Sequence, residues 1–305
     1  MTLPNFIVIG AAKSGTEALC TFLGEHPDVY MCPHREPNFF EAEGRPEVPY
    51  RGPGDAAWLG PEMWTATLEE YEALFAGADH QRAVGEGTAS YLYSDSGEVP
   101  ARIQRHVPEA RLVAVLRNPV DRAYSAYSMM RGIGREPLGR FADALDAEEQ
   151  RRAEGWEPIW HYVRMGLYTE QLRRYDERFA ADQLKVLLYD DFEERPARVL
   201  AELFAYLGVD EAFVPDTTAR HNVSLVPRSS RLHRLTVGRF APRRAAKAVV
   251  PARVRRRLQR RIQAQNLVRP DPLEPALRAR LLETFRPDVL ALQDRLGRDL
   301  SGWLA

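Results

Sequence analysis

The sequence predicts an α/β fold with a central parallel sheet flanked by helices and a mainly helical C-terminal part. Short, continuous apolar runs typical of buried parallel strands recur along the chain, separated by helical stretches. The chain has 305 residues, 45% of them hydrophobic and 28% charged, an ordinary globular composition with enough length for a large core. Because no repeat or clean linker divides it, we expect a single domain over residues 1–305.

The expected elements follow one another from the N-terminus. The first strand covers residues 6–9 and ends in Gly10, and a helix begins near Thr16. The other expected elements are strands at 29–31, 83–84, 111–116 and 184–189, helices at 120–131 and 167–180, and mostly helix from about residue 195. Residues 41–65 are rich in Gly, Pro and aromatic residues without a period, which predicts a long irregular loop.

Composition excludes several classes of protein. The formal net charge of −1 argues against a nucleic-acid partner, so any basic site must be local. Two cysteines, Cys20 and Cys32, are too few for a disulfide framework or a Cys-based zinc site and favour a reducing compartment. We expect no signal peptide and no membrane span. Because 39 of the 42 cationic residues are arginine, as a GC-rich genome would produce, we expect a bacterial, cytoplasmic protein.

The loop Gly10–Thr16 joins a strand to a helix with small residues, so backbone N–H groups can approach an anion at the helix N-terminus. This predicts a P-loop-like, three-layer fold. A nucleoside-triphosphate loop carries Lys-[Ser/Thr] after its second glycine, whereas Thr16 and Glu17 stand there in this chain. Arg117 follows the strand 111–116, where such enzymes place a magnesium-binding acid. A nucleotide kinase is therefore disfavoured and is kept as an alternative.

Two motifs resemble those of sulfotransferases that use 3′-phosphoadenosine-5′-phosphosulfate (PAPS). The segment 12–16, AKSGT, resembles the family's 5′-phosphosulfate loop, and 116–125, LRNPVDRAYS, resembles its 3′-phosphate motif. Similarity to the bacterial and glycan-type branch continues through 166–168, 189–192 and 221–224 to Trp303. The resemblance implies sulfuryl transfer from PAPS to an acceptor hydroxyl by in-line displacement, with release of 3′-phosphoadenosine-5′-phosphate (PAP) and without a metal. The cofactor-binding residues that it implies are Lys13, Ser14, Gly15, Thr16, Glu17, Arg117, Ser125, Tyr168 and Arg228.

The chemistry of the second motif supports its assignment. Arg117 ends a strand and Pro119 suits a first helical position, which places Ser125 about two turns along the next helix. A guanidinium offers a planar fork of donors for a phosphate, and a hydroxyl adds one further hydrogen bond. The alternative is a surface arginine with a solvated serine.

The segment 34–40, HREPNFF, resembles the family's [KR]-E-P-x-F-F stretch, whose glutamate is the general base. Glu36 would take the proton and Lys13 would stabilise the leaving phosphate oxygen. Pro37 predicts an extended backbone at Glu36. The alternatives for Glu36 are an exposed carboxylate or a partner of Arg35. Other candidate bases are His34, His106 and His161, and Phe39 and Phe40 are either core residues or a substrate wall.

One residue departs from the family pattern. In 85–91, GEGTASY, Gly87 replaces a lysine that assists glycan-sulfating members. This weakens a heparan-type interpretation and leaves a non-catalytic binder of sulfated or phosphorylated ligands as a second alternative. The acceptor could be a small molecule, a lipid or a saccharide.

A basic segment, 217–270, contains no acidic residue and fifteen lysines and arginines, including Arg228. Three roles are open for it: a solvated helical face, closure over the anionic donor, or peripheral contact with an acidic partner, membrane surface or carrier protein. By resemblance to the family's C-terminal donor loop, Arg228 is expected near the 3′-phosphate.

Overall fold

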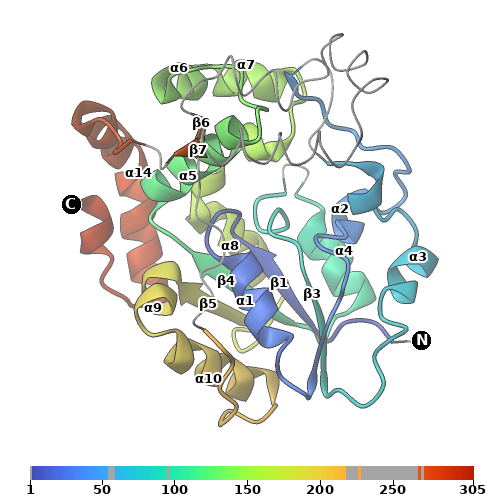
Figure 1. The fold of residues 1–305 in the computed structure, drawn as a ribbon. Helices are drawn as coiled ribbons and strands as arrows, with labels where there is room; N and C mark the ends of the chain where they lie inside the picture. Colours follow the sequence, from blue (N-terminus) through green and yellow to red (C-terminus); the bar gives the residue numbers. More distant parts are fainter. Residues whose placement is uncertain (1, 54–58, 95–96, 218–225, 228–266, 269–270) are drawn as a thin grey trace, which may run out of the picture.

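The computed structural model of the protein describes residues 2–53, 59–94, 97–217, 226–227, 267–268 and 271–305 (Figure 1). Its centre is a five-stranded, all-parallel sheet in the order β2-β3-β1-β4-β5. The strands are β1 (Phe6–Gly10), β2 (Val29–Met31), β3 (Ala83–Gly87), β4 (Arg111–Leu116) and β5 (Leu184–Leu188). The predicted α/β fold with a parallel sheet is thereby confirmed.

Alternation along the strands divides the core into two layers. In β1, Phe6 and Val8 belong to one apolar cluster and Ile7 and Ile9 to the other, and all four are completely buried. The first cluster is covered by α1 (Thr16–Leu23), α9 (Tyr189–Glu194) and α10 (Pro196–Leu207). The second is covered by α4 (Val99–His106), α5 (Pro119–Gly132), α8 (Tyr168–Asp176) and α14 (Pro275–Leu296) (Figure 1).

The predicted elements differ from the observed ones mainly at their ends. β3 continues to Gly87, α8 ends at Asp176, and Tyr189 begins α9 rather than ending β5. Six short helices had no sequence prediction: α4 and α9, whose bounds are given above, and α2 (Phe39–Ala42), α3 (Leu68–Ala73), α6 (Phe141–Asp146) and α7 (Glu148–Ala153). They are too short for a clear 3.6-residue period, and α3 is defined instead by a capping box between Thr67 and Glu70.

The described residues after 195 are mostly helical, as expected for them, and also form a short antiparallel ladder between β6 (Val226–Pro227) and β7 (Leu267–Val268). Most of the basic segment 217–270, including Arg228, lies outside the described residues. In the part of the chain that the structure describes, no helix is long and apolar enough to cross a bilayer.

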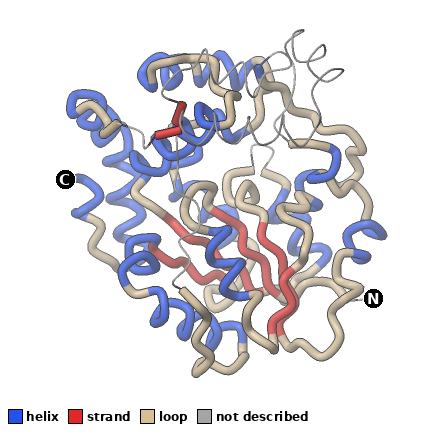
Figure 2. The backbone as a smooth tube through the Cα atoms, viewed as in Figure 1, coloured by secondary structure: helices blue, strands red, loops and turns tan. Residues whose placement is uncertain are grey.

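The topology brings five loops to one edge of the sheet. Because all strands are parallel, their carboxyl ends meet at that edge of the sheet, whose strands lie side by side in Figure 2. In the strand order, β2 and β3 lie on one side of β1, and β4 and β5 lie on the other. Across this edge, in spatial order, come Glu36 after β2, Ser90 after β3, Lys13 after β1, Arg117 after β4 and Tyr189 after β5. The sheet order therefore separates Glu36 from Arg117 by the Lys13 loop.

Candidate active site

A cavity of about 950 Å³ runs along this edge of the sheet. Of the ten residues predicted to act in catalysis or to bind the cofactor, seven line it: Lys13, Gly15, Thr16, Glu17, Glu36, Arg117 and Ser125. The fold thus brings both motifs and the Glu36 segment to a single cavity, although the motifs are about one hundred residues apart in the chain. Its size is within the usual range for small-molecule and cofactor sites.

The loop before α1 lines the cavity with Ala12, Lys13 and Gly15. Lys13 has φ 71° and Gly15 has φ 87°, both in the left-handed region. A Cβ at Gly15 would lie 3.1 Å from the Tyr189 ring, so both the backbone conformation and the limited space favour glycine there. With this geometry the loop leads directly into the N-terminus of α1, a position that favours an anion.

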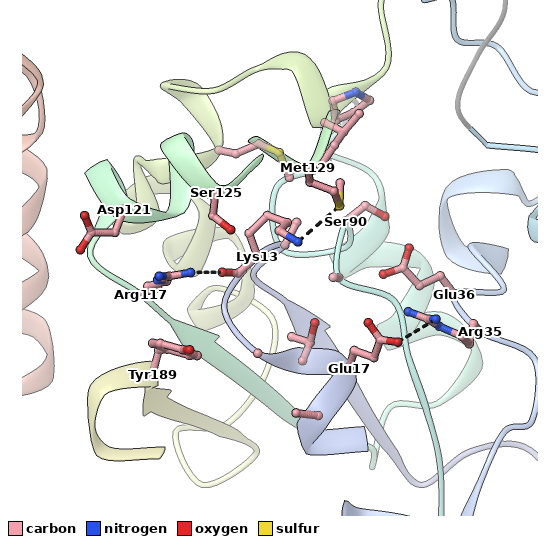
Figure 3. A pocket seen from close by; sticks show the side chains of 18 of the residues that line it. Lys13, Glu17, Arg35, Glu36, Ser90, Arg117, Asp121, Ser125, Met129 and Tyr189 are labelled. Carbon is pink, nitrogen blue, oxygen red and sulfur yellow. Dashed lines mark hydrogen bonds and ion pairs between the residues drawn. The ribbon is translucent and has the colours of Figure 1, made fainter. Parts of the chain in front are cut away.

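Lys13 occupies the centre of the cavity (Figure 3). Its Nζ lies 3.3 Å from the Met129 Sδ of α5. Burial, followed by the positive charge of Arg117, lowers the pKa of Lys13 below the usual range for lysine. An anion that binds beside the Lys13 ammonium would stabilise its positive charge, because it would replace the water that burial removed.

Arg117 lies on one side of Lys13, on the same side as Ser125 (Figure 3). Its guanidinium stacks over the Tyr189 ring at 4.6 Å from the centroid, and Nη1 donates to the Lys13 carbonyl at 3.2 Å. Two contacts therefore orient the guanidinium before any ligand arrives, while both Arg117 and Ser125 line the cavity.

Asn118 explains the start of α5. Its Oδ1 accepts from the N–H groups of Val120 at 3.0 Å and Asp121 at 3.3 Å, which caps the helix ahead of Pro119. Its Nδ2 donates to the Trp303 carbonyl at 3.0 Å. The cap fixes where α5 begins and therefore where Ser125 faces the cavity.

Ser14 and Tyr168 do not line the cavity. Both side chains are completely buried beneath the loop, and the Tyr168 hydroxyl donates to the Arg117 carbonyl at 2.9 Å. Burial raises the pKa of Tyr168 to about 12, against the opposing positive charge of Arg122. Tyr168 therefore holds the end of β4 from the interior of the fold.

Glu36 lies on the opposite side of Lys13 from Arg117 (Figure 3). Its φ is 49°, so the extended backbone expected from Pro37 is wrong. The left-handed turn is held by the buried Asn38, whose Nδ2 donates to the carbonyls of Glu36 and Met63 and whose Oδ1 accepts from Ser90. Strained backbone of this kind is common at functional sites.

Burial raises the pKa of Glu36, against the opposing effects of Arg35 and of the Ala89 N–H. A raised pKa makes the carboxylate a better proton acceptor near neutral pH. Arg35 pairs with Glu17 at 2.7 Å, and since these side chains are 71% and 37% exposed, this ion pair contributes little stability.

The three histidines considered as bases lie outside the cavity lining. His106 Nε2 lies 2.7 Å from Glu43 Oε1, and His161 Nδ1 lies 2.9 Å from the Tyr93 hydroxyl. His34 is half-buried and is likewise absent from the described lining.

Gly87 is packed against α1. A Cβ at this position would lie 2.5 Å from Cys20 Sγ, so a lysine here would require the thiol to move. The preceding residue, Glu86, is completely buried and accepts from the hydroxyls of Tyr71 at 3.0 Å and Thr88 at 2.7 Å. Position 87 therefore belongs to the packing between sheet and helix in this chain.

Several lining residues were missed from the sequence. On the Arg117 side, an apolar wall is formed by Phe22, Tyr189, Phe192 and Pro196. The lining also contains Glu41, Tyr50, Met63, Glu157, Ile159 and Met165. Tyr189 and Phe192 fell within a segment resembling the family, but Glu41 and Glu157 carried no local signal. Within the described ranges, no group of three or more His, Cys, Asp or Glu residues could hold a metal ion.

Comparison with known proteins gives consistent matches. Residues 4–213 match the model of the sulfotransferase family. A crystal structure of a sulfotransferase from Alicyclobacillus acidocaldarius is 33% identical, covers 100% of both chains and superposes with a TM-score of 0.76.

Curated relatives include the mouse heparan sulfate glucosamine 3-O-sulfotransferase 3A1, 28% identical over 68% of this chain and 46% of that protein. The bifunctional heparan sulfate N-deacetylase/N-sulfotransferase 1 of Caenorhabditis briggsae is 24% identical over 69% of this chain and 23% of that protein. The matched region spans less than half the length of each. With the family model matching more than half of this chain and a full-length structural relative, the protein belongs to the sulfotransferase family of enzymes.

Proposed function

We propose that this enzyme transfers the sulfuryl group of PAPS to an acceptor hydroxyl by in-line displacement. The observation that carries the proposal is the position of Lys13 between Arg117 and Ser125 on one side and Glu36 on the other. One side of the cavity therefore offers cations for the donor's phosphates, and the opposite side offers a carboxylate for the acceptor's proton.

In the proposed step, the acceptor oxygen forms a bond to sulfur as the bond between sulfur and the bridging phosphate oxygen breaks. The electron pair of the broken bond stays on the 5′-phosphate of PAP, where the Lys13 ammonium stabilises the developing charge. The hydroxyl proton passes to the Glu36 carboxylate.

The residues present suit the donor. The Gly15 turn and the N-terminus of α1 form an anion cradle for the 5′-phosphosulfate, and Arg117 with Ser125 would hold the 3′-phosphate. The apolar wall of Phe22, Phe192 and Pro196 suits a purine base. Tyr168 supports this arrangement from outside the cavity through its hydrogen bond to the Arg117 carbonyl.

The test is turnover of ³⁵S-labelled PAPS with a panel of hydroxyl compounds, in parallel with calorimetric titration of PAP. We expect PAP to bind without magnesium and more tightly than ATP, and label to appear in at least one acceptor. Magnesium-dependent preference for ATP would instead support a kinase, and PAP binding without transfer to any acceptor would support a non-catalytic binder.

A further inference from the structure

We infer that Met129 is a positioning residue, whose thioether holds the Lys13 ammonium ready for the phosphate oxygen from which the sulfuryl group departs. The inference rests on the proposed sulfuryl transfer and adds to it a residue that no sequence motif singled out. It is carried by the contact between the two side chains, by the helix that presents Met129, and by the chemistry of a sulfur acceptor.

Lys13 is held at both ends. At its base, the backbone is in the left-handed region, with φ 71°, and the Lys13 carbonyl accepts from Arg117 Nη1 at 3.2 Å. At its tip, Nζ lies 3.3 Å from Met129 Sδ, a hydrogen-bonding distance for sulfur (Figure 3). A lysine ammonium sits on a flexible four-carbon stem, so a contact at its tip reduces the number of orientations that it samples. The Met129 contact therefore defines where the ammonium points inside the cavity.

Met129 is presented by the helix that also carries Ser125. The two residues are four apart in α5, so they lie on the same face of the helix, and both line the cavity. The next residue, Met130, is completely buried and belongs to the apolar core. Because the Asn118 cap sets where α5 begins, it sets the position of Met129 together with that of Ser125. One helix thus contacts Lys13 and, in the proposed complex, the 3′-phosphate.

A thioether is suited to hold a cation that must later act on a phosphate. Sulfur is a weak acceptor, whereas a phosphate oxygen forms a strong, charge-assisted hydrogen bond, so the donor can replace the sulfur easily. The thioether is also uncharged, unlike a carboxylate, and it leaves the positive charge of Lys13 available for the charge that develops on the leaving oxygen. Met129 would therefore orient the ammonium in the unliganded protein and release it as the donor binds.

The pKa of Lys13 offers a direct measure of this contact. Burial is its largest influence and lowers it. The charged groups that also act on it, from several elements of the described structure, are Arg117, Glu17, Glu36 and Arg122. The two arginines lower the pKa and the two glutamates raise it. Replacing the methionine by an uncharged residue leaves all four groups in place, so a change in the pKa would report the altered contact at the ammonium.

The chain contains only three lysines, Lys13, Lys185 and Lys247, which makes the measurement simple. Protein labelled with ¹³C at the lysine Cε gives one NMR signal for each, and Lys13→Arg identifies the signal of Lys13. In the unliganded protein, Met129→Leu should lower the pKa of Lys13 by about 0.3 to 1 pH unit, because the ammonium loses an acceptor. Met129→Gln should raise the pKa, because an amide carbonyl is a stronger acceptor than a thioether.

The matched control is Met130→Leu, the same substitution at the next residue of α5, which should leave the pKa of Lys13 unchanged. Kinetics with an acceptor found by the labelled-PAPS panel provide the second readout. Met129→Leu should lower kcat by about three- to tenfold, with PAP affinity within about twofold of the wild type, because the misplaced ammonium acts on the transition state. Met130→Leu should retain kcat.

An unchanged pKa of Lys13 in Met129→Leu would overturn the inference. An equal shift in Met130→Leu would also overturn it, since it would indicate a general disturbance of α5. If Met129→Leu does not fold, Met129→Gln replaces it, and a pKa at or below the wild-type value would be the contrary result. The NMR comparison requires neither donor nor acceptor, so a wild-type protein that transfers no sulfuryl group would reject the proposed function separately.

Discussion

The Arg117 guanidinium lies over the Tyr189 ring, 4.6 Å from its centroid, and thereby connects the ends of two neighbouring strands. A second pair of the same kind lies at the other end of β4, where Arg111 lies over Tyr206 at 5.8 Å. Only the first pair lines the cavity. The two arginines therefore have similar stacking partners and different access to a ligand.

Replacement of Arg117 should weaken the binding of PAP much more than the binding of 5′-AMP. Arg117→Ala should weaken PAP binding by roughly 10- to 100-fold, because a charge-assisted hydrogen bond contributes about 1.5–3 kcal/mol. Binding of 5′-AMP, which lacks the 3′-phosphate, should change far less. Both affinities are measured by calorimetry, with Arg111→Ala as the control that leaves them unchanged. An equal loss for the two nucleotides would show that Arg117 does not hold the 3′-phosphate.

Lys13→Ala should lower kcat on the order of 100- to 1,000-fold, while PAP affinity falls less, because the ammonium acts on charge that develops in the transition state. Steady-state kinetics and PAP titration together distinguish these effects, with Lys185→Ala as the control. A variant that loses donor affinity alone would make Lys13 a simple phosphate anchor.

The lowered pKa of Lys13 also has a kinetic consequence. Because the cationic form is the active one, kcat/KM should fall on the alkaline side at a pH below the usual range for lysine. Lys13→Arg should move this decline to higher pH. If the alkaline decline of kcat/KM occurs at the same pH in wild type and Lys13→Arg, a group other than Lys13 causes it.

Glu36→Gln should reduce turnover on the order of 10²- to 10⁴-fold and leave PAP affinity nearly unchanged, because the amide cannot accept the acceptor's proton. Since burial raises the pKa of Glu36, the acidic limb of kcat/KM should lie above the usual range for glutamate and disappear in the variant. The exposed Glu211→Gln is the control. Near-normal turnover by Glu36→Gln would redirect the search to His34, His106 and His161.

Glu86 should make folding stability depend on pH. Burial raises its pKa from 4.5 to about 7, so the folded protein binds a proton that the unfolded chain releases. Its contribution to stability is therefore fully present below pH 4.5 and is lost as pH rises towards 7 and above.

Glu86→Gln should flatten this dependence. The free energy of unfolding, measured in urea between pH 5 and 8, should fall less steeply with pH in the variant than in the wild type. The exposed Glu69→Gln should retain the wild-type slope. Parallel curves for wild type and Glu86→Gln would mean that Glu86 does not titrate in this range.

The sequence by itself determined the strands and the local turns. Continuous apolar runs predict β1 and β4 because a strand buried on both faces has no polar side. Pro119 marks the start of α5 because a proline in the first turn of a helix costs no backbone hydrogen bond. The Gly15 turn and the arginine after β4 are likewise properties of a few adjacent residues. For these features, local sequence and final structure agree.

Only the tertiary structure decided which loops face one another. The sheet order places Glu36 across Lys13 from Arg117, and this order depends on long-range packing that no local pattern encodes. The same packing turned Ser14 into the interior, gave Glu36 a left-handed backbone despite Pro37, and left no free space for a side chain at Gly87. Glu41 and Glu157 are about 115 residues apart in the chain, and only the tertiary fold brings both of them to the lining of one cavity.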